Sequence, residues 1–447
     1  RLFDLLEALE RRLDEVERTV KKTSRNSSQP PSSDGLQRQA AEPREKGAKP
    51  KGGQPGHAGT TRAWTETPDA VVELRPQGLC SCGLALADQV GVEGERRQQI
   101  EIPEPQAFVT EYRQVKVVCE CGCRHRGDFP LGVTPYVSYG SRLKAYAVGL
   151  VNGHFVSLTR TAEILGDQYG VQPSDGSIQK WIGQAAEALR PVYEATREAL
   201  TVAEVVHFDE SGVRIQGKTQ WLHVAGTPLL AFYTVHAKRG LEAMTSANIL
   251  PRFTGYAVHD HWKPYYCFEA VTHALCNAHI LRELRYFEEA TGGHHWPTRL
   301  REILVAGKKA VEAARAEGRT EVEAATASTL LKQYDEWVAR GLMVFPEQSR
   351  EAGRKGRQKQ EPATNLLRRL RDFKADVWRF LTDFQVPFDN NLAERLVRPV
   401  KVKLKVAGGF RAFGGAEHFC ILRSVWKTNQ LQSINPFQTL RIVFAGG

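Results

Sequence analysis

The chain has 447 residues, of which 41% are hydrophobic and 25% are charged, and this composition excludes a fibrous or wholly disordered protein. A single hydrophobic core does not extend over such a length, so two to four domains are expected. No stretch approaches about 18 uncharged apolar residues, and no secretory pattern is present. The sequence therefore predicts no membrane span and a cytoplasmic protein.

The net charge of +10 is concentrated in two segments. Lys21–Arg62 holds nine Lys or Arg residues against three acids, and Arg395–Lys427 holds eight against one. Two separated basic segments indicate a polyanionic partner, most simply nucleic acid. The alternative explanation is that these charges serve solubility alone.

The first 22 residues carry apolar side chains at alternating spacings of four and three. These are Leu2, Leu6, Leu9, Leu13, Val16 and Val20. This heptad pattern predicts a coiled-coil helix over residues 1–22 and a homo-oligomer that is at least a dimer. The alternative is an amphipathic helix packed on its own domain. Residues 23–63 are rich in Ser, Pro, Gly and Lys/Arg, which predicts a flexible basic arm able to order along DNA phosphates.

Residues 64–135 have a strand-like pattern, clearest over Phe108–Val118, and cysteine groups bracket it. The groups are Cys80 with Cys82, and Cys119 with Cys121 and Cys123. Grouped cysteines in a large cytosolic chain indicate metal ligands, and structural Zn²⁺ takes four thiolate or imidazole ligands in a tetrahedron. Five thiols and His125 compete for those positions. The expected Zn²⁺ ligands are Cys80, Cys82, Cys119 and Cys121, with Cys123 as the alternate; buried free thiols are the other explanation.

Residues 136–200 have a helical pattern that resembles a helix–turn–helix. A first helix is predicted over Thr159–Tyr169 and ends at Gly170, and Ser174 is a suitable N-cap for a second helix. The second helix would bury its apolar residues and present Gln179 and Lys180 to DNA. Any two-helix hairpin has a similar pattern, so packing alone is the alternative.

Strand-like runs follow residue 201, and two of them end in an acid. The runs are Val202–Asp209, Gln220–Ala225, Leu229–His236, Tyr256–Asp260 and Ala270–Leu275. Their order suggests an α/β ribonuclease H-like sheet, in which three antiparallel strands are extended by two parallel ones. The first and fourth strands then lie side by side and bring Asp209 and Asp260 together. Two close carboxylates repel each other unless a cation lies between them, and paired Mg²⁺ or Mn²⁺ ions would also supply phosphoryl-transfer chemistry. The alternative is that the strand ends reach solvent.

A third carboxylate is expected on a helix predicted over Phe388–Arg398. Asp383, Asp389 and Glu394 are candidates by position; Asp389 suits the helix cap, which leaves Glu394 as the predicted ligand. The 134 residues between Asp260 and Glu394 imply a helical insertion. Cys276 and His279 have a one-turn spacing that suits a metal, but two ligands are too few, so stabilisation of a strand-to-helix junction is expected instead.

Basic residues follow the predicted third acid directly. They are Arg395, Arg398, Lys401, Lys403 and Lys405. The three lysines alternate with apolar residues, and this period of two would place them on one side of an extended segment. The expected role of these five residues is to bind DNA phosphates near the metals.

Several motifs together carry a family resemblance. They are Pro31-Ser32-Ser33-Asp34-Gly35, Gly52–His57, His207–Ser211, Val258-His259-Asp260, Cys276–Leu284 and Asn390–Arg395. With them the chain resembles, over nearly its whole length, bacterial transposases of the insertion-sequence-sixty-six family, which belong to the acid-triad (DDE) class. The resemblance implies Mg²⁺-dependent cutting at element ends and joining to target DNA, with Asp209, Asp260 and Glu394 as the triad. The Cys-x-Cys spacing departs from the two intervening residues more common in that family, which leaves the zinc ligand set open.

The sequence thus predicts a DNA transposase with seven segments. They are a coiled coil (1–22), a basic arm (23–63), a zinc-binding domain (64–135), a helix-turn-helix-like domain (136–200), a first catalytic part (201–290), a helical insertion (291–385) and a last catalytic helix with a basic C-terminal region (386–447). The expected partners are double-stranded DNA, other copies of the chain and possible accessory proteins, at the bacterial nucleoid. Two other functions remain open: a zinc-containing DNA-binding regulator without catalysis, and a ribonuclease H-like nuclease without strand transfer.

Overall fold

The computed structural model describes residues 62–446 except 93, 131, 134, 291–293 and 349–357. The chain divides into two units, of which Gln37–Gln106 is one and Ala107–Gly447 lies in the other. The predicted coiled coil and nearly all of the predicted basic arm lie outside the described residues. None of the described helices combines the length and the apolar character that a bilayer crossing requires.

Regular β-structure is sparse in the described part of residues 62–135. A short antiparallel hairpin joins β1 (Lys116–Val118) to β2 (Arg124–Arg126). The strand predicted over Phe108–Val118 is therefore wrong for its first eight residues. Phe108 and Val109 are 82% and 96% exposed, and no described strand pairs with them. Side chains with high strand propensity do not form a strand without a pairing partner.

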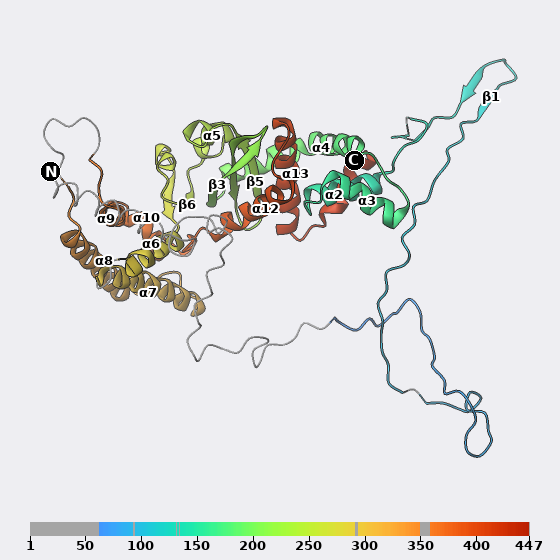
Figure 1. Cartoon of the computed structure of the whole chain (residues 1–447), viewed down its shortest axis with the longest axis horizontal. Coiled ribbons are helices and arrows are strands. Elements are labelled where there is room, and N and C mark those ends of the chain that lie inside the picture. The colour runs from blue at the N-terminus through green and yellow to red at the C-terminus, as the bar shows by residue number, and fades with distance from the viewer. Residues whose placement is uncertain are drawn as a thin grey trace, which may run out of the picture. The chain divides into compact units, whose positions relative to one another are not determined.

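The unit that includes Ala107–Gly447 contains a five-stranded mixed sheet (Figure 1). Its strands are β3 (Val205–Ile215), β4 (Lys218–Gly226), β5 (Ala231–His236), β6 (Tyr256–His259) and β7 (Thr272–Leu275). The order is β5-β4-β3-β6-β7. The strands β3, β4 and β5 pair antiparallel, β6 pairs parallel with β3, and β7 pairs parallel with β6. The predicted adjacency of the first and fourth strands is confirmed, and the mixed α/β arrangement is compatible with the ribonuclease H-like fold.

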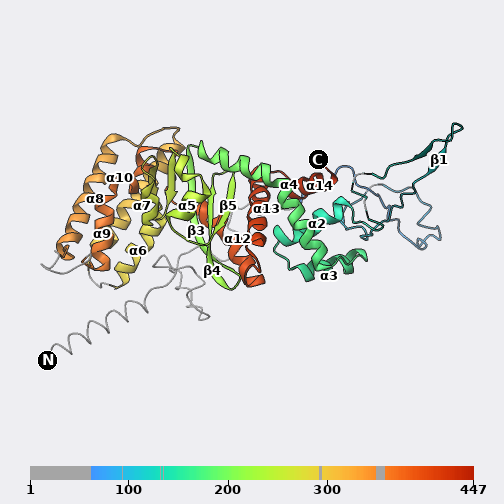
Figure 2. The same ribbon diagram turned by 90° about the horizontal axis from the view of Figure 1, so that it is seen from above.

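Helices flank both edges of this sheet (Figure 2). Before and within the sheet region lie α2 (Ser141–Asn152), α3 (Leu158–Tyr169), α4 (Asp175–Thr201) and α5 (Leu241–Ala247). Beside the β7 edge lie α6 (Asn277–Ala290), α7 (Trp296–Ala316), α8 (Ala324–Val344), α9 (Pro362–Asp372), α10 (Lys374–Val377) and α11 (Arg379–Thr382). The chain ends with α12 (Asn391–Ala407), α13 (Phe413–Leu431) and α14 (Pro436–Ala445). Short 3₁₀ turns occupy Leu250–Arg252 and Lys263–Cys267.

The predicted α3–turn–α4 segment is confirmed as a helix pair. Gly170 ends α3 in the left-handed conformation (φ 67°), and the Ser174 hydroxyl accepts a hydrogen bond from the Ser177 N–H at the start of α4. Ile178 and Trp181 are buried as expected. Because these caps satisfy N–H and C=O groups that the helix ends leave free, the local sequence fixes both boundaries.

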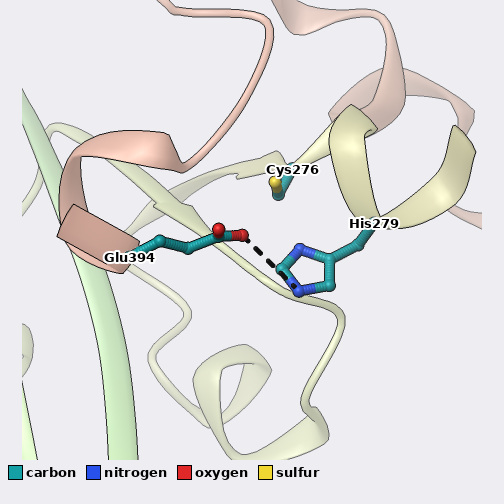
Figure 3. A group of neighbouring side chains, drawn as sticks. All are labelled: Cys276, His279 and Glu394. Carbon is teal, nitrogen blue, oxygen red and sulfur yellow. Dashed lines mark ion pairs between the residues drawn. The ribbon is translucent and has the colours of Figure 1, made fainter. Parts of the chain in front are cut away.

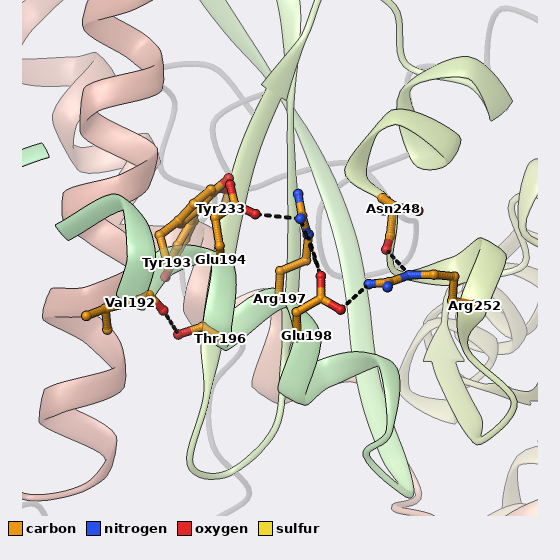
Figure 4. Close-up of polar contacts among 9 residues, drawn as sticks. All are labelled: Val192, Tyr193, Glu194, Thr196, Arg197, Glu198, Tyr233, Asn248 and Arg252. Atoms are coloured by element: carbon orange, nitrogen blue, oxygen red, sulfur yellow. Dashed lines mark hydrogen bonds and ion pairs between the residues drawn. The ribbon is translucent and has the colours of Figure 1, made fainter. Parts of the chain in front are cut away.

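The second half of α4 is attached to the sheet and to the segment after α5 (Figure 4). The Tyr193 hydroxyl donates to the Tyr233 carbonyl of β5 at 3.0 Å. The Arg252 guanidinium binds the Glu198 carboxylate at 2.7 Å. One helix therefore links the α3–α4 pair to the core of the sheet.

The helix α13 covers the open edge of β5, which no pattern in the sequence indicated. The Ser424 hydroxyl accepts a hydrogen bond from the Tyr233 N–H at 2.9 Å, and the Thr428 hydroxyl accepts one from the Ala231 N–H at 3.0 Å. These two hydroxyls lie one helical turn apart and satisfy alternate donors of the edge strand. An edge strand protected in this way is closed to further strand pairing.

The helix α12 packs closely on β3 and β4. A Cβ atom at Gly226 would lie 2.5 Å from the Leu396 side chain, so glycine at this position allows the close approach. Lys401, Lys403 and Lys405 belong to this helix, and the predicted extended segment is wrong. An alternation over six residues does not distinguish a strand from a helix, and here the helical hydrogen bonds of α12 continue through the segment.

Candidate active site beside two parallel strands

The parallel register of β3 and β6 places Asp209 and Asp260 at the same level. Val205 is opposite Tyr256, and His207 is opposite Val258, so paired residues differ by 51 in number. Asp209 and Asp260 differ by the same 51, and Asp260 is the first residue after β6. Neighbouring strands lie about 4.8 Å apart. The two acids that the sequence singled out are therefore neighbours. Asp260 follows the end of β6, whereas Asp209 lies within β3, which continues to Ile215, so the predicted strand end at Asp209 is wrong.

Asn390 fixes the start of α12 against both strands. Its side chain is 2% exposed; its Oδ1 accepts from His207 Nδ1 at 2.8 Å, and its Nδ2 donates to the Phe208 carbonyl at 2.7 Å. Its backbone N–H donates to the Cys276 thiol sulfur at 3.1 Å, directly after β7. Glu394 lies one helical turn further along α12, so these bonds position its carboxylate beside the strand ends.

The site carries an excess of buried negative charge. Burial, followed by the neighbouring Glu210, Asp260 and Glu394 carboxylates, raises the pKa of Asp209 to about 8. Burial also raises the pKa of Asp260. Without a cation, Asp209 holds a proton at neutral pH. The three acids repel one another through their charges, and a divalent cation that prefers oxygen ligands would remove this repulsion. Their oxygens do not all lie within 4.8 Å of one another in the structure.

Glu210 has a different role from its neighbour Asp209. Its side chain is 2% exposed, and its Oε1 accepts from the Nε and Nη2 atoms of Arg239 at 3.1 and 2.7 Å. The Tyr265 hydroxyl donates to its other oxygen at 2.9 Å. The Arg239 guanidinium lies over the rings of Trp221 and Trp262. Successive strand residues point to opposite faces, so Glu210 lies on the other face of β3 from Asp209, which faces α12. The charges of Glu210 and Arg239 still act on Asp260.

Cationic side chains from helices around the β7 edge lie near the acids. Arg282 of α6 is 3.2 Å from the Glu394 Oε1 atom, and His279 Nε2 is 3.8 Å from the same oxygen. Arg369 of α9 binds Glu283 at 2.7 Å and acts on the pKa of Asp260 through its charge. Arg282 and Arg369 were not predicted from the sequence, because only the folded chain brings α6 and α9 to the acids.

The other two candidate acids have structural partners. Asp389 Oδ1 accepts from the Asn391 N–H at 3.0 Å and forms a turn just before α12. The N-cap residue is Asn390, so the predicted cap at Asp389 is wrong by one position. Asp383 Oδ1 accepts from the Gln385 N–H at 2.9 Å within the preceding turn. Both arrangements are local, which favours Glu394 as the third acid.

The predicted DNA-binding residues divide into two groups. Gln179 and Lys180 are exposed on α4, and Arg395, Arg398 and Lys405 are exposed on α12, where Lys401 is half-buried. Lys403 lies on another side of α12, and its ammonium group is 5.4 and 5.5 Å from the ring centres of Phe410 and Phe419. The expectation that the three lysines share one face is therefore wrong, because a spacing of two on a helix separates side chains by about 200°.

The cysteine groups form two turns with the same hydrogen bonds. In the first, the Cys80 N–H donates to the Leu84 carbonyl and the Gly83 N–H to the Cys80 carbonyl, both at 2.8 Å. In the second, Cys119 donates to Cys123 and Gly122 to Cys119, again both at 2.8 Å. Gly83 and Gly122 have φ values of 89° and 84°, which favour glycine.

Within these turns, hydrogen bonds lower the pKa of two thiols. A backbone hydrogen bond from Cys82 is the main cause at Cys80, and one from Cys123 is the main cause at Cys121. A thiol with a lowered pKa reaches the thiolate form that binds metal more readily. The pairs Cys80/Cys82 and Cys119/Cys121 occupy equivalent positions, and Cys123 stands where the first turn has Leu84.

The transposase IS66 family matches residues 137–418, which is more than half of the chain. The chain therefore belongs to the IS66 family of transposases, a class of DNA-binding enzymes that move insertion sequences. Residues 2–63 match a family of unknown function, DUF6444. The chain is also similar to a protein of Sinorhizobium fredii (strain NBRC 101917 / NGR234) named "Uncharacterized protein y4hP". The two are 23% identical over 418 residues, which cover 84% of this chain and 71% of that protein.

Replacement of Asn390 by Ala should destabilise the fold. The change leaves the His207 ring nitrogen and the Phe208 carbonyl buried without partners, so a loss of about 3 kcal/mol in the free energy of unfolding is expected. Urea denaturation measures this loss. Asn391→Ala is the matched control, since Asn391 is the next residue and is only half-buried; a similar loss in both variants would contradict the role of Asn390.

The buried Asp209 carboxyl should make the metal-free protein less stable as pH rises from about 4 to 8. The unfolded Asp209 carboxyl, with its ordinary pKa of 3.8, releases its proton in this range, while the folded one keeps it until its pKa of about 8. The folded state therefore binds more protons, and this group lowers the free energy of unfolding by up to about 1.4 kcal/mol per pH unit. Urea denaturation at pH 5 and pH 8 should show a smaller decrease for Asp209→Asn. An equal decrease in both proteins would refute the buried, protonated carboxyl.

Proposed function

We propose that this IS66-family chain is a DNA transposase that cuts at the ends of its element and joins the 3′ ends to target DNA. The observation that carries the proposal is the convergence of three acids from distant segments. The register of β3 and β6 supports the pairing of Asp209 with Asp260, and the hydrogen bonds of Asn390 support the approach of Glu394. A ribonuclease H-like catalytic domain is the fold that this arrangement favours.

In the proposed reaction, Asp209, Asp260 and Glu394 would hold the metal ions. Two Mg²⁺ or Mn²⁺ ions bound there would activate the attacking oxygen and stabilise the leaving one. Water attacks the phosphorus at the element end, the bond from phosphorus to the 3′-oxygen breaks, and a 3′-hydroxyl is released. That hydroxyl then attacks a phosphorus of target DNA and loses its proton; the bond to the target 3′-oxygen breaks, and this oxygen leaves as a 3′-hydroxyl. Asn390 orients the helix that carries Glu394, and Arg282 and Arg369 place positive charge beside the phosphates.

The exposed basic residues of α12 support a DNA path beside the acids. Glu394, Arg398, Lys401 and Lys405 follow one another at spacings of four, three and four, which is one stripe of a helix. Arg395 is exposed next to this stripe, and Gln179 and Lys180 are exposed on α4. We assign the stripe to phosphate contacts and α4 to the element end.

The twin cysteine turns support a structural Zn²⁺ ion held by Cys80, Cys82, Cys119 and Cys121. Two turns with the same hydrogen bonds would each contribute an equivalent pair of thiolates. Cys123 has Leu84 as its counterpart, so it is the odd thiol of the five. We assign the heptad pattern at residues 1–22 to self-association, and accessory proteins remain possible partners.

The two rival functions are distinguished by chemistry. A DNA-binding regulator needs no complete set of acids, and a nuclease of the same fold would cut DNA without joining it. Membership of a transposase family favours transposition over both. An assay that follows labelled element ends into a target plasmid separates the three functions, because only a transposase yields joined products.

Glu394→Gln should abolish Mg²⁺-dependent cleavage and joining while binding to DNA persists, because it keeps the shape and removes the charge that holds a metal. Asp209→Asn and Asp260→Asn should act in the same way. Asp389→Asn is the matched control, since an amide oxygen still accepts the Asn391 N–H. Gel-based cleavage of labelled ends measures the effect. If Glu394→Gln still cuts while Asp389→Asn does not, Asp389 is the ligand.

The double variant Arg398→Ala with Lys405→Ala should bind all DNA duplexes more weakly. Loss of two phosphate contacts should reduce the slope of log affinity against log salt by about 1.8. Fluorescence anisotropy over a salt series measures both. Lys403→Met is the control, because it keeps the packing on Phe410 and Phe419 without the charge. A loss confined to one DNA sequence would contradict phosphate binding.

Cys121→Ser should lose the tightly bound zinc of the purified protein, whereas Cys123→Ser should retain about one zinc per protomer. The difference follows from the equivalence of Cys121 with Cys82, while Cys123 has an apolar counterpart. Atomic emission of reduced, freshly purified protein measures the content. Retention by Cys121→Ser and loss by Cys123→Ser would reverse the assignment.

A further inference from the structure

Three potential metal ligands of different chemistry meet beside the acid site (Figure 3). Cys276 directly precedes α6, His279 lies in the first turn of α6, and Glu394 lies in the first turn of α12. Their donor atoms all lie within 4.8 Å of one another. Within the described part of the chain, no other group of three or more His, Cys, Asp or Glu side chains is so close. The fold thus supplies the third ligand that the Cys-x-x-His spacing lacks in the sequence.

The His279 ring nitrogen and the Cys276 sulfur have surroundings that suit metal ligands. The Nδ1 atom of His279 is buried and has no hydrogen-bond partner in the structure, which is costly for a neutral imidazole unless another group binds there. The Cys276 sulfur accepts the Asn390 N–H, and it lies at the N-terminal end of α6. Both features stabilise a thiolate, and N–H donors to sulfur are common around bound metals.

Two features of the metal-free protein oppose the binding of a cation here: nearby arginine side chains and a protonated thiol. The negative charge of the bound ligands offsets them. Arg282 and Arg369 are cationic neighbours of His279. Burial raises the pKa of the Cys276 thiol to about 12, so it is protonated until a metal displaces the proton. One thiolate and one carboxylate together neutralise the charge of a divalent ion.

Cys276, His279 and Glu394 together favour a softer metal ion than the Mg²⁺ that suits the carboxylates. Thiolate, imidazole and carboxylate are ordinary ligands of Zn²⁺, whereas Mg²⁺ prefers oxygen alone. Zinc with these bond lengths separates its ligand atoms by about 3.3–3.8 Å. The donors lie within 4.8 Å of one another in the metal-free structure, so bringing them to that separation requires shifts of about 1–1.5 Å.

We propose that Cys276, His279 and Glu394 form a second metal site, for Zn²⁺ or a similar borderline-soft divalent ion, distinct from the cysteine turns. Glu394 belongs to both sites, so zinc bound here withdraws it from the acid triad and inhibits cleavage. This second part rests on the proposed catalytic role of Glu394. The existence of the site does not.

Cobalt binding to the full-length protein tests the site without any activity. Co²⁺ bound to a thiolate has a charge-transfer absorption, and it is added to protein that retains its purification zinc. The wild type should show this band, and Cys276→Ser should lose it while keeping a hydroxyl to accept the Asn390 N–H. Cys267→Ser is the matched control, since Cys267 is exposed and lies outside the group. An unchanged band in Cys276→Ser, with circular dichroism of a folded protein, overturns the site.

Zinc inhibition tests the sharing of Glu394. Cleavage at fixed Mg²⁺ is titrated with Zn²⁺, and each variant is compared with its own zinc-free rate. Half-inhibition of Cys276→Ser and His279→Gln should need at least about tenfold more zinc than that of the wild type. Equal midpoints in all three proteins overturn the competition. If the wild type cleaves no DNA under any metal while cobalt binding depends on Cys276, the proposed function fails and the site stands.

Discussion

The hydrogen bonds of Asn390 connect three parts of the chain that are far apart in sequence. Its amide binds His207 and Phe208 of β3, and its N–H binds the Cys276 sulfur beyond β7. All three contacts are buried, so losing one leaves a polar atom without water or partner. This cost holds the start of α12 in a single place. The position of Glu394, the direction of the basic stripe and the meeting with His279 all depend on it.

The same arrangement makes the acid end of the sheet unfavourable for stability. Asp209 and Asp260 are buried, and the pKa of each is raised. Hydrophobic packing on the two faces of the sheet and the α13 contacts on β5 must offset this unfavourable term. A protein that retains such a cluster gains from it only when cations bind, since each ion both removes repulsion and stabilises the folded state. Stability and proposed catalysis therefore depend on the same charges.

Local patterns predicted much of the fold, and contacts between distant segments account for what was missed. Gly170 and Ser174 predicted the ends of α3 and α4 because caps are local. The order of the strand-like runs predicted the adjacency of β3 and β6, although β3 continues past Asp209 to Ile215. The lysine alternation after Arg398 was misinterpreted, since Lys403 packs on two phenylalanines that follow it in the chain. Arg369 was missed because its position beside the acids depends on how α9 packs against α6.

The position of Glu394 between two sets of ligands follows from the packing of two helix N-termini. The first turn of α12 lies beside Asp209 and Asp260, the proposed Mg²⁺ ligands, and the start of α6 brings the Cys276 sulfur and the His279 ring close to Glu394. A carboxylate in such a position is available to either a hard or a softer cation, but not fully to both. Arg282, 3.2 Å from Glu394, is the third competitor for this carboxylate in the metal-free protein. In the proposed mechanism, the balance among these three partners decides what fraction of the protein molecules has Glu394 available for Mg²⁺.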